Sequence, residues 1–127
     1  MPEPMLGHVS FGVRDLARAS AFYDAVLAAL GYVRVWTGER GVGYAEPGGG
    51  DKLNLFAEGD AAKPPGAGFH LAFNAPSRAA VDAFHAAALA HGGTELGRPG
   101  LRERYSPTYY AAFVLDPDGY KLEAVNQ

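Results

Sequence analysis

Apolar and polar residues alternate in two stretches of the chain, Leu6–Val13 and Gly68–Asn74. The apolar positions are Val9, Phe11 and Val13 in the first stretch and Phe69, Leu71 and Phe73 in the second. Successive side chains of a β-strand point to opposite faces, so each stretch is predicted to be a strand with one apolar face. The other face carries His8 in the first strand and His70 in the second.

A helical pattern follows each of these two strands. Apolar residues recur at helical spacing between Asp15 and Gly31, and again between Ser77 and Gly92. Aspartate and serine are favoured N-cap residues, and glycine is favoured just past the last turn of a helix. The sequence therefore predicts two helices that begin after Asp15 and Ser77.

Short strand patterns complete each half of the chain. The predicted strands are Tyr32–Thr37, Gly41–Glu46 and Lys52–Ala57 in the first half and Thr94–Gly97, Tyr109–Leu115 and Gly119–Val125 in the second. Turn residues at Pro47–Gly50 and Asp116–Gly119 separate neighbouring strands. The polar segment Arg98–Thr108 is predicted to be a loop.

The two halves align with each other without a gap when the chain is shifted by 62 residues, from position 8 to position 70. The identical residues in the first half are His8, Phe11, Ala17, Ala21, Phe22, Ala25, Leu27, Ala28 and Gly31. The chain is thus one β-α-β-β-β unit used twice, which predicts an α+β fold. We expect the first module at about 5–57, a linker rich in Ala, Gly and Pro at about 58–67, and the second module at about 68–127.

The polar residues of four predicted strands lie on the faces that the helices do not cover. Strand parity places His8, Asn54, His70 and Glu123 on these faces. With helices on one side of a curved sheet, the other side forms the wall of a cavity. A buried carboxylate without a partner is costly, and a divalent cation would satisfy it together with the imidazoles. The pattern therefore predicts a metal site near a pseudo-twofold axis.

Composition narrows the classes of partner. The formal net charge is −3 and the chain lacks a strongly basic cluster, so a nucleic acid partner is not expected. No apolar run is long enough to span a membrane and the N-terminus does not resemble a signal peptide, which favours a cytoplasmic location. Because there is no cysteine, only imidazole and oxygen groups are available as metal ligands.

Three segments resemble the vicinal oxygen chelate superfamily of glyoxalase, fosfomycin-resistance, extradiol-dioxygenase and bleomycin-resistance proteins. They are His8-Val-Ser-Phe-Gly-Val-Arg-Asp-Leu with Ala21-Phe-Tyr, Gly68-Phe-His-Leu-Ala-Phe, and Phe113-Val-Leu-Asp-Pro-Asp-Gly-Tyr-Lys-Leu-Glu. The resemblance covers nearly the whole chain. It implies a glyoxalase-like fold of two tandem βαβββ modules, with curved mixed sheets and helices on their outer face, and a homodimer whose sites are shared between subunits.

By this resemblance, His8, His70 and Glu123 fall on three of the family's four metal-ligand positions, and Asn54 falls on the fourth. The implied cofactor is one divalent ion per site, either Zn, Ni, Mn, Fe or Co, which chelates two neighbouring oxygens of a small substrate. An amide neither carries negative charge nor accepts a proton at neutral pH. Asn54 therefore argues against glyoxalase I-type isomerisation, in which a carboxylate at that position takes part in proton transfer.

Two histidines and one glutamate match the fosfomycin-resistance transferases, and Ser10 lies where these carry a hydroxyl residue. Their cation-binding loop has no counterpart in the chain. The same ligand set forms the iron triad of extradiol dioxygenases, whose chains are usually longer. The expected substrate contacts are Ser10, Asn54, Arg102, Arg104, Tyr105 and Tyr109, since guanidinium groups suit carboxylates and phosphates. The candidate catalytic residues are Glu123 and Tyr105.

Three classes of function remain open. The first is a metal-dependent enzyme of isomerase, lyase, thiol-transferase or dioxygenase type. The second is a metal-free protein that binds a small molecule or antibiotic in the same cavity, as bleomycin-resistance proteins do. The third is a regulatory or accessory protein with a vestigial cavity. Metal content distinguishes the first class from the other two.

Overall fold

A computed structural model describes residues 3–127, in which a single order of elements occurs twice. The first half comprises β1 (Val9–Val13), α1 (Leu16–Ala29), β2 (Val33–Thr37), β3 (Gly41–Ala45) and β4 (Leu53–Ala57). A short 3-10 helix, η1 (Gly59–Ala61), follows. The second half comprises β5 (Leu71–Asn74), α2 (Arg78–Ala90), β6 (Thr94–Leu101), β7 (Tyr110–Leu115) and β8 (Lys121–Asn126). Neither helix within 3–127 is long and apolar enough to cross a membrane.

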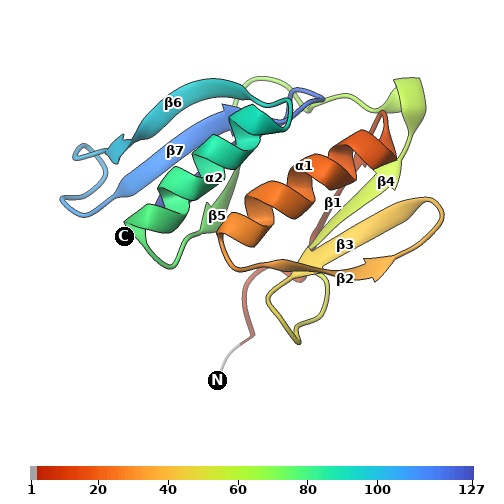
Figure 1. Cartoon of the computed structure of the whole chain (residues 1–127), viewed down its shortest axis with the longest axis horizontal. Helices are drawn as coiled ribbons and strands as arrows, with labels where there is room; N and C mark the ends of the chain where they lie inside the picture. Colours follow the sequence, from red (N-terminus) through yellow and green to blue (C-terminus); the bar gives the residue numbers. More distant parts are fainter. Residues whose placement is uncertain (1–2) are drawn as a thin grey trace.

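Each half forms its own four-stranded mixed sheet. Sheet A has the strand order β1-β4-β3-β2, and sheet B has the equivalent order β5-β8-β7-β6. The pairs β1·β4 and β5·β8 are parallel, and the other neighbours are antiparallel. The two helices lie side by side in the centre of Figure 1, with sheet A towards the right and sheet B towards the left. The predicted α+β fold of repeated βαβββ units is confirmed.

The helix ends are formed by the residues that the sequence indicates. The side chain of Asp15 accepts a hydrogen bond from the backbone N–H of Arg18 (3.0 Å), and Ser77 Oγ accepts one from Ala80 (3.0 Å). Gly31 follows the end of α1 with a φ of +91°, which an L side chain rarely adopts. The capping residues therefore set where each helix begins and ends.

Strand β6 is longer than predicted, because residues expected in the polar loop continue to pair with β7. Gly100 and Leu101 are in register with Ala111 and Tyr110 across two irregularities in the ladder. Pro99 is tolerated here because β6 is the edge strand of sheet B, where proline is compatible with a bulged ladder.

One hydrophobic core lies between the helices and the inner faces of both sheets. Its fully buried members include Phe22 and Val26 of α1, Phe84 of α2, Leu55 of β4 and Leu122 of β8. Alternate residues of β4 and β8 therefore point into the core. Their neighbours, which include Asn54 and Glu123, point to the opposite faces of the sheets.

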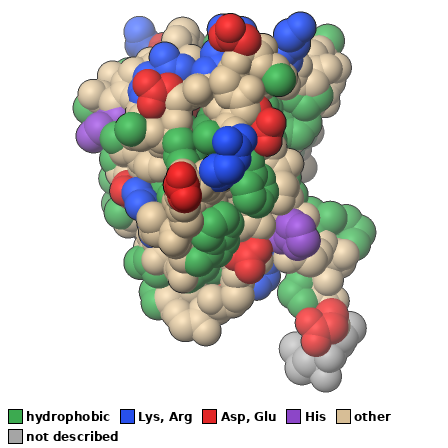
Figure 2. Space-filling model, turned by 90° about the vertical axis from the view of Figure 1, so that its right-hand side faces the viewer, with side chains coloured by type: hydrophobic (Ala, Val, Ile, Leu, Met, Phe, Trp, Pro, Cys, Tyr) green, Lys and Arg blue, Asp and Glu red, His purple; other side chains and the backbone are tan. Residues whose placement is uncertain are grey.

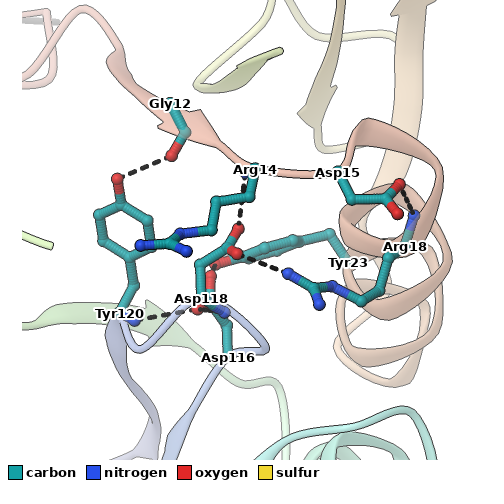
Figure 3. A network of polar contacts seen from close by, with 8 residues as sticks. All are labelled: Gly12, Arg14, Asp15, Arg18, Tyr23, Asp116, Asp118 and Tyr120. Atoms are coloured by element: carbon teal, nitrogen blue, oxygen red, sulfur yellow. Dashed lines mark hydrogen bonds and ion pairs between the residues drawn. The ribbon is translucent and has the colours of Figure 1, made fainter. Parts of the chain in front are cut away.

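A buried polar contact ties the β7–β8 turn of the second half to α1 of the first half (Figure 3). Asp116 Oδ2 accepts a hydrogen bond from the Tyr23 hydroxyl (2.5 Å), and Oδ1 accepts the backbone N–H groups of Asp118 (2.8 Å) and Tyr120 (2.9 Å). Burial raises the pKa of the Asp116 carboxyl, and these hydrogen bonds oppose that shift. We refer to Tyr23, Asp116, Asp118 and Tyr120 as the Asp116 clasp.

The clasp also reaches β1. The Tyr120 hydroxyl donates to the carbonyl oxygen of Gly12 (2.7 Å), and Arg18 Nη2 pairs with Asp118 Oδ1 (2.7 Å). Tyr120 stacks on Phe11 with ring centroids 4.1 Å apart. Because Tyr120 immediately precedes β8, these contacts fix the start of the strand that carries Glu123.

Candidate functional site

Glu123 lies in the middle of sheet B, on the face that α2 does not cover. Register across the sheet places it beside Ala72 of β5 on one side and Phe113 of β7 on the other, and Phe113 is beside Gly97 of β6. Paired residues share a face, so these four residues form a row across the open side of sheet B. We call it row B.

The Glu123 carboxylate is held at both oxygens. Oε1 lies 2.9 Å from Nε2 of His70, and Oε2 accepts a 2.5 Å hydrogen bond from the Tyr109 hydroxyl. The Glu123 side chain is 2% exposed, whereas that of His70 is 42% exposed. Burial and the hydrogen bond to Glu123 raise the pKa of Tyr109 to about 12, so its phenol stays protonated at neutral pH and donates that hydrogen bond.

This group lies in the wall of a cavity of about 430 Å³ on the open side of sheet B. The β6–β7 loop supplies Arg102, Arg104, Tyr105 and Tyr109 to the same wall. Four of the six residues expected to contact substrate are therefore brought together around His70 and Glu123. Arg102 is anchored there, because Nη1 donates to Gly100 O (2.9 Å) and Nη2 to Arg98 O (2.8 Å).

The equivalent row of sheet A has a different content. It consists of Ser10 of β1, Asn54 of β4, Gly43 of β3 and Trp36 of β2. The Trp36 indole Nε1 donates to Asn54 Oδ1 (2.8 Å), and Asn54 Nδ2 donates to Asp51 Oδ2 (2.7 Å). Both ends of the Asn54 amide are thus occupied by protein groups. We call this set row A.

A β-bulge explains why Trp36 lies on the open face. Arg34 pairs with Tyr44, and both contact Asp24 on α1, so this pair is on the helix side. The register then shifts, and Trp36 pairs with Gly43 on the opposite face. A Cβ atom at position 43 would lie 1.9 Å from Trp36 Nε1, so glycine there makes room for the indole. Figure 2 shows exposed hydrophobic side chains among charged ones on the side where sheet A lies.

His8 does not join His70 and Glu123 within one chain. It is exposed and immediately precedes β1, in the position that His70 holds relative to β5. Within residues 3–127, no three His, Cys, Asp or Glu side chains are placed to hold one metal ion. Ser10 and Asn54 also lie on sheet A, apart from the cavity on sheet B.

The donor groups of His70 and Glu123 fit a divalent cation. Two ligands bound to one ion by bonds of about 2.0–2.2 Å lie about 3.4 Å apart in tetrahedral coordination and about 3 Å apart in octahedral coordination. Nε2 of His70 and Oε1 of Glu123 are separated by 2.9 Å. The Tyr109 hydroxyl restrains the other carboxylate oxygen, as hydrogen-bond partners of metal ligands commonly do.

Sequence reasoning does not identify Phe113 or Lys121 as residues of the open faces. Lys121 is two residues before Glu123 on β8, so strand parity alone could have placed it in the cavity wall. Phe113 could have been found in the same way on β7. The face on which Trp36 lies does not follow from strand parity, because it depends on the bulge in β2.

Comparisons with known proteins agree with this architecture. The family profile described as Glyoxalase/Bleomycin resistance protein/Dioxygenase superfamily matches residues 5–124. A glyoxalase/bleomycin resistance protein from Albidiferax ferrireducens T118 is 37% identical, with a TM-score of 0.84 and coverage of 98% of this chain and 99% of that chain. A search of curated proteins gives no match.

Two more distant structures share the fold. A glyoxalase/bleomycin resistance protein/dioxygenase family enzyme from Burkholderia phytofirmans PsJN is 24% identical, with a TM-score of 0.71 and coverage of 94% of this chain and 95% of that chain. The fosfomycin resistance protein FosX from Listeria monocytogenes is 17% identical, with a TM-score of 0.68 and coverage of 98% and 93%.

Proposed function

Since the chain belongs to the Glyoxalase/Bleomycin resistance protein/Dioxygenase superfamily, we propose that it is a metal-dependent enzyme acting on a small molecule through two neighbouring oxygens. The observation that carries the proposal is the His70–Glu123 pair. An imidazole nitrogen and a carboxylate oxygen lie 2.9 Å apart in the wall of an open cavity, with a phenol restraining the second oxygen. This is an arrangement of ligands that leaves room for substrate.

In this proposal His8 of the partner subunit completes the ligand set in a homodimer. His8 is exposed and occupies on sheet A the position that His70 occupies on sheet B. An exposed ligand residue that cannot reach the pair in its own chain is what a site shared between subunits requires. Ser10 and Asn54 would then lie on the wall opposite the β6–β7 loop, which carries Arg102 and Arg104.

A divalent ion held by these residues would supply Lewis acid chemistry, stabilising negative charge on a substrate oxygen. Tyr109 orients Glu123 through the hydrogen bond that its hydroxyl donates to Oε2. Arg102 and Arg104 would bind negatively charged groups of the substrate. The Tyr105 hydroxyl lies 3.4 Å from Arg104 Nη2. Tyr105 is the candidate for moving a proton, with Glu123 as the alternative. Isomerisation, lyase and thiol-transfer reactions all fit this set of groups.

Metal analysis of protein purified without chelator tests the proposal. We expect about one divalent ion per chain, and we expect His70→Ala to lose most of it, because one of three ligands is removed. His85→Ala is a matched control. His85 Nε2 also lies 2.9 Å from a carboxylate oxygen, that of Glu95, but this pair joins α2 to β6 on the helix side of sheet B.

Unchanged metal content in His70→Ala, or equal loss in both variants, contradicts the ligand assignment. A protein that contains no metal after such a purification, and takes up none when Zn, Ni, Mn, Fe or Co is added, contradicts the enzyme proposal as a whole.

The alternative is a metal-free binding protein of the bleomycin-resistance type. One observation favours it: among residues 3–127, every buried side-chain nitrogen and oxygen already has a hydrogen-bond partner. Glu123 in particular is satisfied by His70 and Tyr109 without a cation. Binding of a small molecule or antibiotic by metal-free protein, unchanged in His70→Ala, would favour this alternative.

A further inference from the structure

The cavity on sheet B has an excess of positive charge that the ligand pair does not explain. Its walls contain Arg102, Arg104 and Lys121, and Glu123 is its one carboxylate. Both oxygens of Glu123 are already engaged by His70 and Tyr109. In the described part of the chain, none of the three cations forms an ion pair with a carboxylate.

Two of the cations share one aromatic ring. Arg102 Cζ lies 5.4 Å from the centroid of Phe113, and Lys121 Nζ is also 5.4 Å from it. Attraction to the ring offsets part of the repulsion between the two positive charges. The remaining repulsion is relieved when an anion lies between them, because opposite charges attract strongly in a partly enclosed site.

The geometry of Arg102 is suited to such a role. Two of its N–H groups donate to backbone carbonyls of β6, which fixes the plane of the guanidinium. The other N–H groups have no side-chain acceptor in the described residues. A guanidinium has five donors, so three remain for a ligand. A preorganised guanidinium beside an ammonium group is a common way to bind an oxyanion.

We propose that the cavity on sheet B binds the oxyanion group of a small organic acid, with Lys121 and Arg102 as its contacts and Phe113 as an apolar platform. The cavity, about 430 Å³, is the size of a small-molecule site. The inference rests on the proposed function in that the anion is the substrate of the metal site. It adds the substrate class and a residue, Lys121, that sequence reasoning did not assign.

Anion titration of metal-free protein followed by NMR tests the inference. The protein is first freed of metal with a chelator, and the chelator is then removed. The probes are benzoate and inorganic phosphate. We expect saturable shifts of the backbone amides of Gly97, Phe113 and Lys121. We expect Lys121→Met to weaken binding about tenfold, as for loss of one charge-assisted hydrogen bond in a partly open site.

Two further variants make the result specific. Lys63→Met removes an exposed ammonium outside this cavity and should leave the affinity unchanged. Lys121→Arg keeps the charge and should retain binding, which separates loss of the anion contact from loss of structure. Stronger binding of benzoate identifies a carboxylate substrate, and stronger binding of phosphate identifies a phosphate or phosphonate.

Shifts that do not saturate, or equal weakening by Lys121→Met and Lys63→Met, overturn the inference. Because the titration uses metal-free protein, this result does not depend on whether the protein binds metal. Metal content tests the proposed function separately, so failure of one proposal can be distinguished from failure of the other.

Discussion

Tyr109 is the residue that most directly controls the orientation of Glu123. Its hydroxyl donates to one carboxylate oxygen and leaves the other facing His70. The raised pKa, about 12, keeps the phenol protonated throughout the neutral range. Tyr109 is therefore a positioning residue for the proposed metal ligand, as well as part of the cavity wall.

Tyr109→Phe should weaken metal binding about tenfold without changing the number of sites, because partners of metal ligands typically contribute this much. The measurement is a competition titration with a metal indicator. Tyr110→Phe is the matched control. Its hydroxyl donates to Asp82 Oδ1 (2.7 Å) on α2, so the same kind of phenol–carboxylate bond is lost on the other face of β7. Equal effects of the two variants would contradict the role of Tyr109.

Among the elements, the edge strand β2 decides what row A presents on the open face of sheet A. Its bulge turns Trp36 onto the open face, where Gly43 leaves room for the indole. The indole then occupies Asn54 Oδ1, the atom that would otherwise be available to a metal or substrate. Row A therefore offers an aromatic surface, and row B offers the Glu123 carboxylate beside the Phe113 ring.

Gly43→Ala should displace the indole and break its hydrogen bond to Asn54, since the new Cβ atom would overlap Trp36 Nε1. Trp36 is the one tryptophan of the chain, so its fluorescence reports the change. We expect emission at longer wavelength and greater quenching by iodide, with a loss of about 1–3 kcal/mol in the free energy of unfolding. Gly50→Ala, which meets no atom within 4 Å, is the control and should leave the spectrum unchanged.

The β7–β8 turn makes stability depend on pH through the Asp116 clasp. Burial raises the pKa of Asp116, so the folded state holds this proton more tightly than the unfolded state. The stabilisation is complete below the unfolded pKa, near pH 4, and it is lost as pH rises through the folded pKa. Asp116→Asn has no carboxyl to titrate, so its stability does not fall with rising pH for this reason. Its amide oxygen can still accept hydrogen bonds from the two backbone N–H groups.

The melting temperature of Asp116→Asn relative to wild type should therefore increase as pH rises from about 4 to 7. Thermal unfolding followed by circular dichroism at several pH values measures the difference. Asp60→Asn, an exposed carboxylate in η1, serves as the control. A constant difference across this range would show that Asp116 does not titrate differently in the folded and unfolded states.

The regularity of a strand decides whether the faces of its residues can be predicted from the sequence. Strand parity places Glu123 and His70 on the open side of sheet B because β5 and β8 run without irregularity. The same rule fails for Trp36, since one extra residue in β2 reverses the parity after Arg34. The length of β6 was also missed, because pairing with β7 outweighs the turn-like composition of Arg98–Leu101.

On the scale of the whole molecule, the separation of His8 from the His70–Glu123 pair allows the proposed shared site to be tested by mixing two variants that each lack one proposed ligand. His8→Ala and His70→Ala homodimers each lack one ligand in both sites. In a mixed dimer, one site has neither histidine altered, because His8 comes from one chain and His70 from the other.

Unfolding and refolding an equal mixture should therefore restore about a quarter of the wild-type metal content, since half of the dimers are mixed and each has one intact site. Each variant refolded alone is the control and should bind little metal. If the mixture binds no more than the separate variants, the three ligands do not come from two chains.

The unequal rows of the two halves also bear on how a duplicated protein changes over generations. Row B holds the carboxylate on which ion binding is proposed to depend, so few replacements there would be tolerated. Row A instead holds an amide, Asn54, whose oxygen is engaged by the Trp36 indole. Successive replacements at Trp36 would change the open face of sheet A while leaving the His70–Glu123 pair untouched, which makes this half the natural place for a lineage to acquire new substrates.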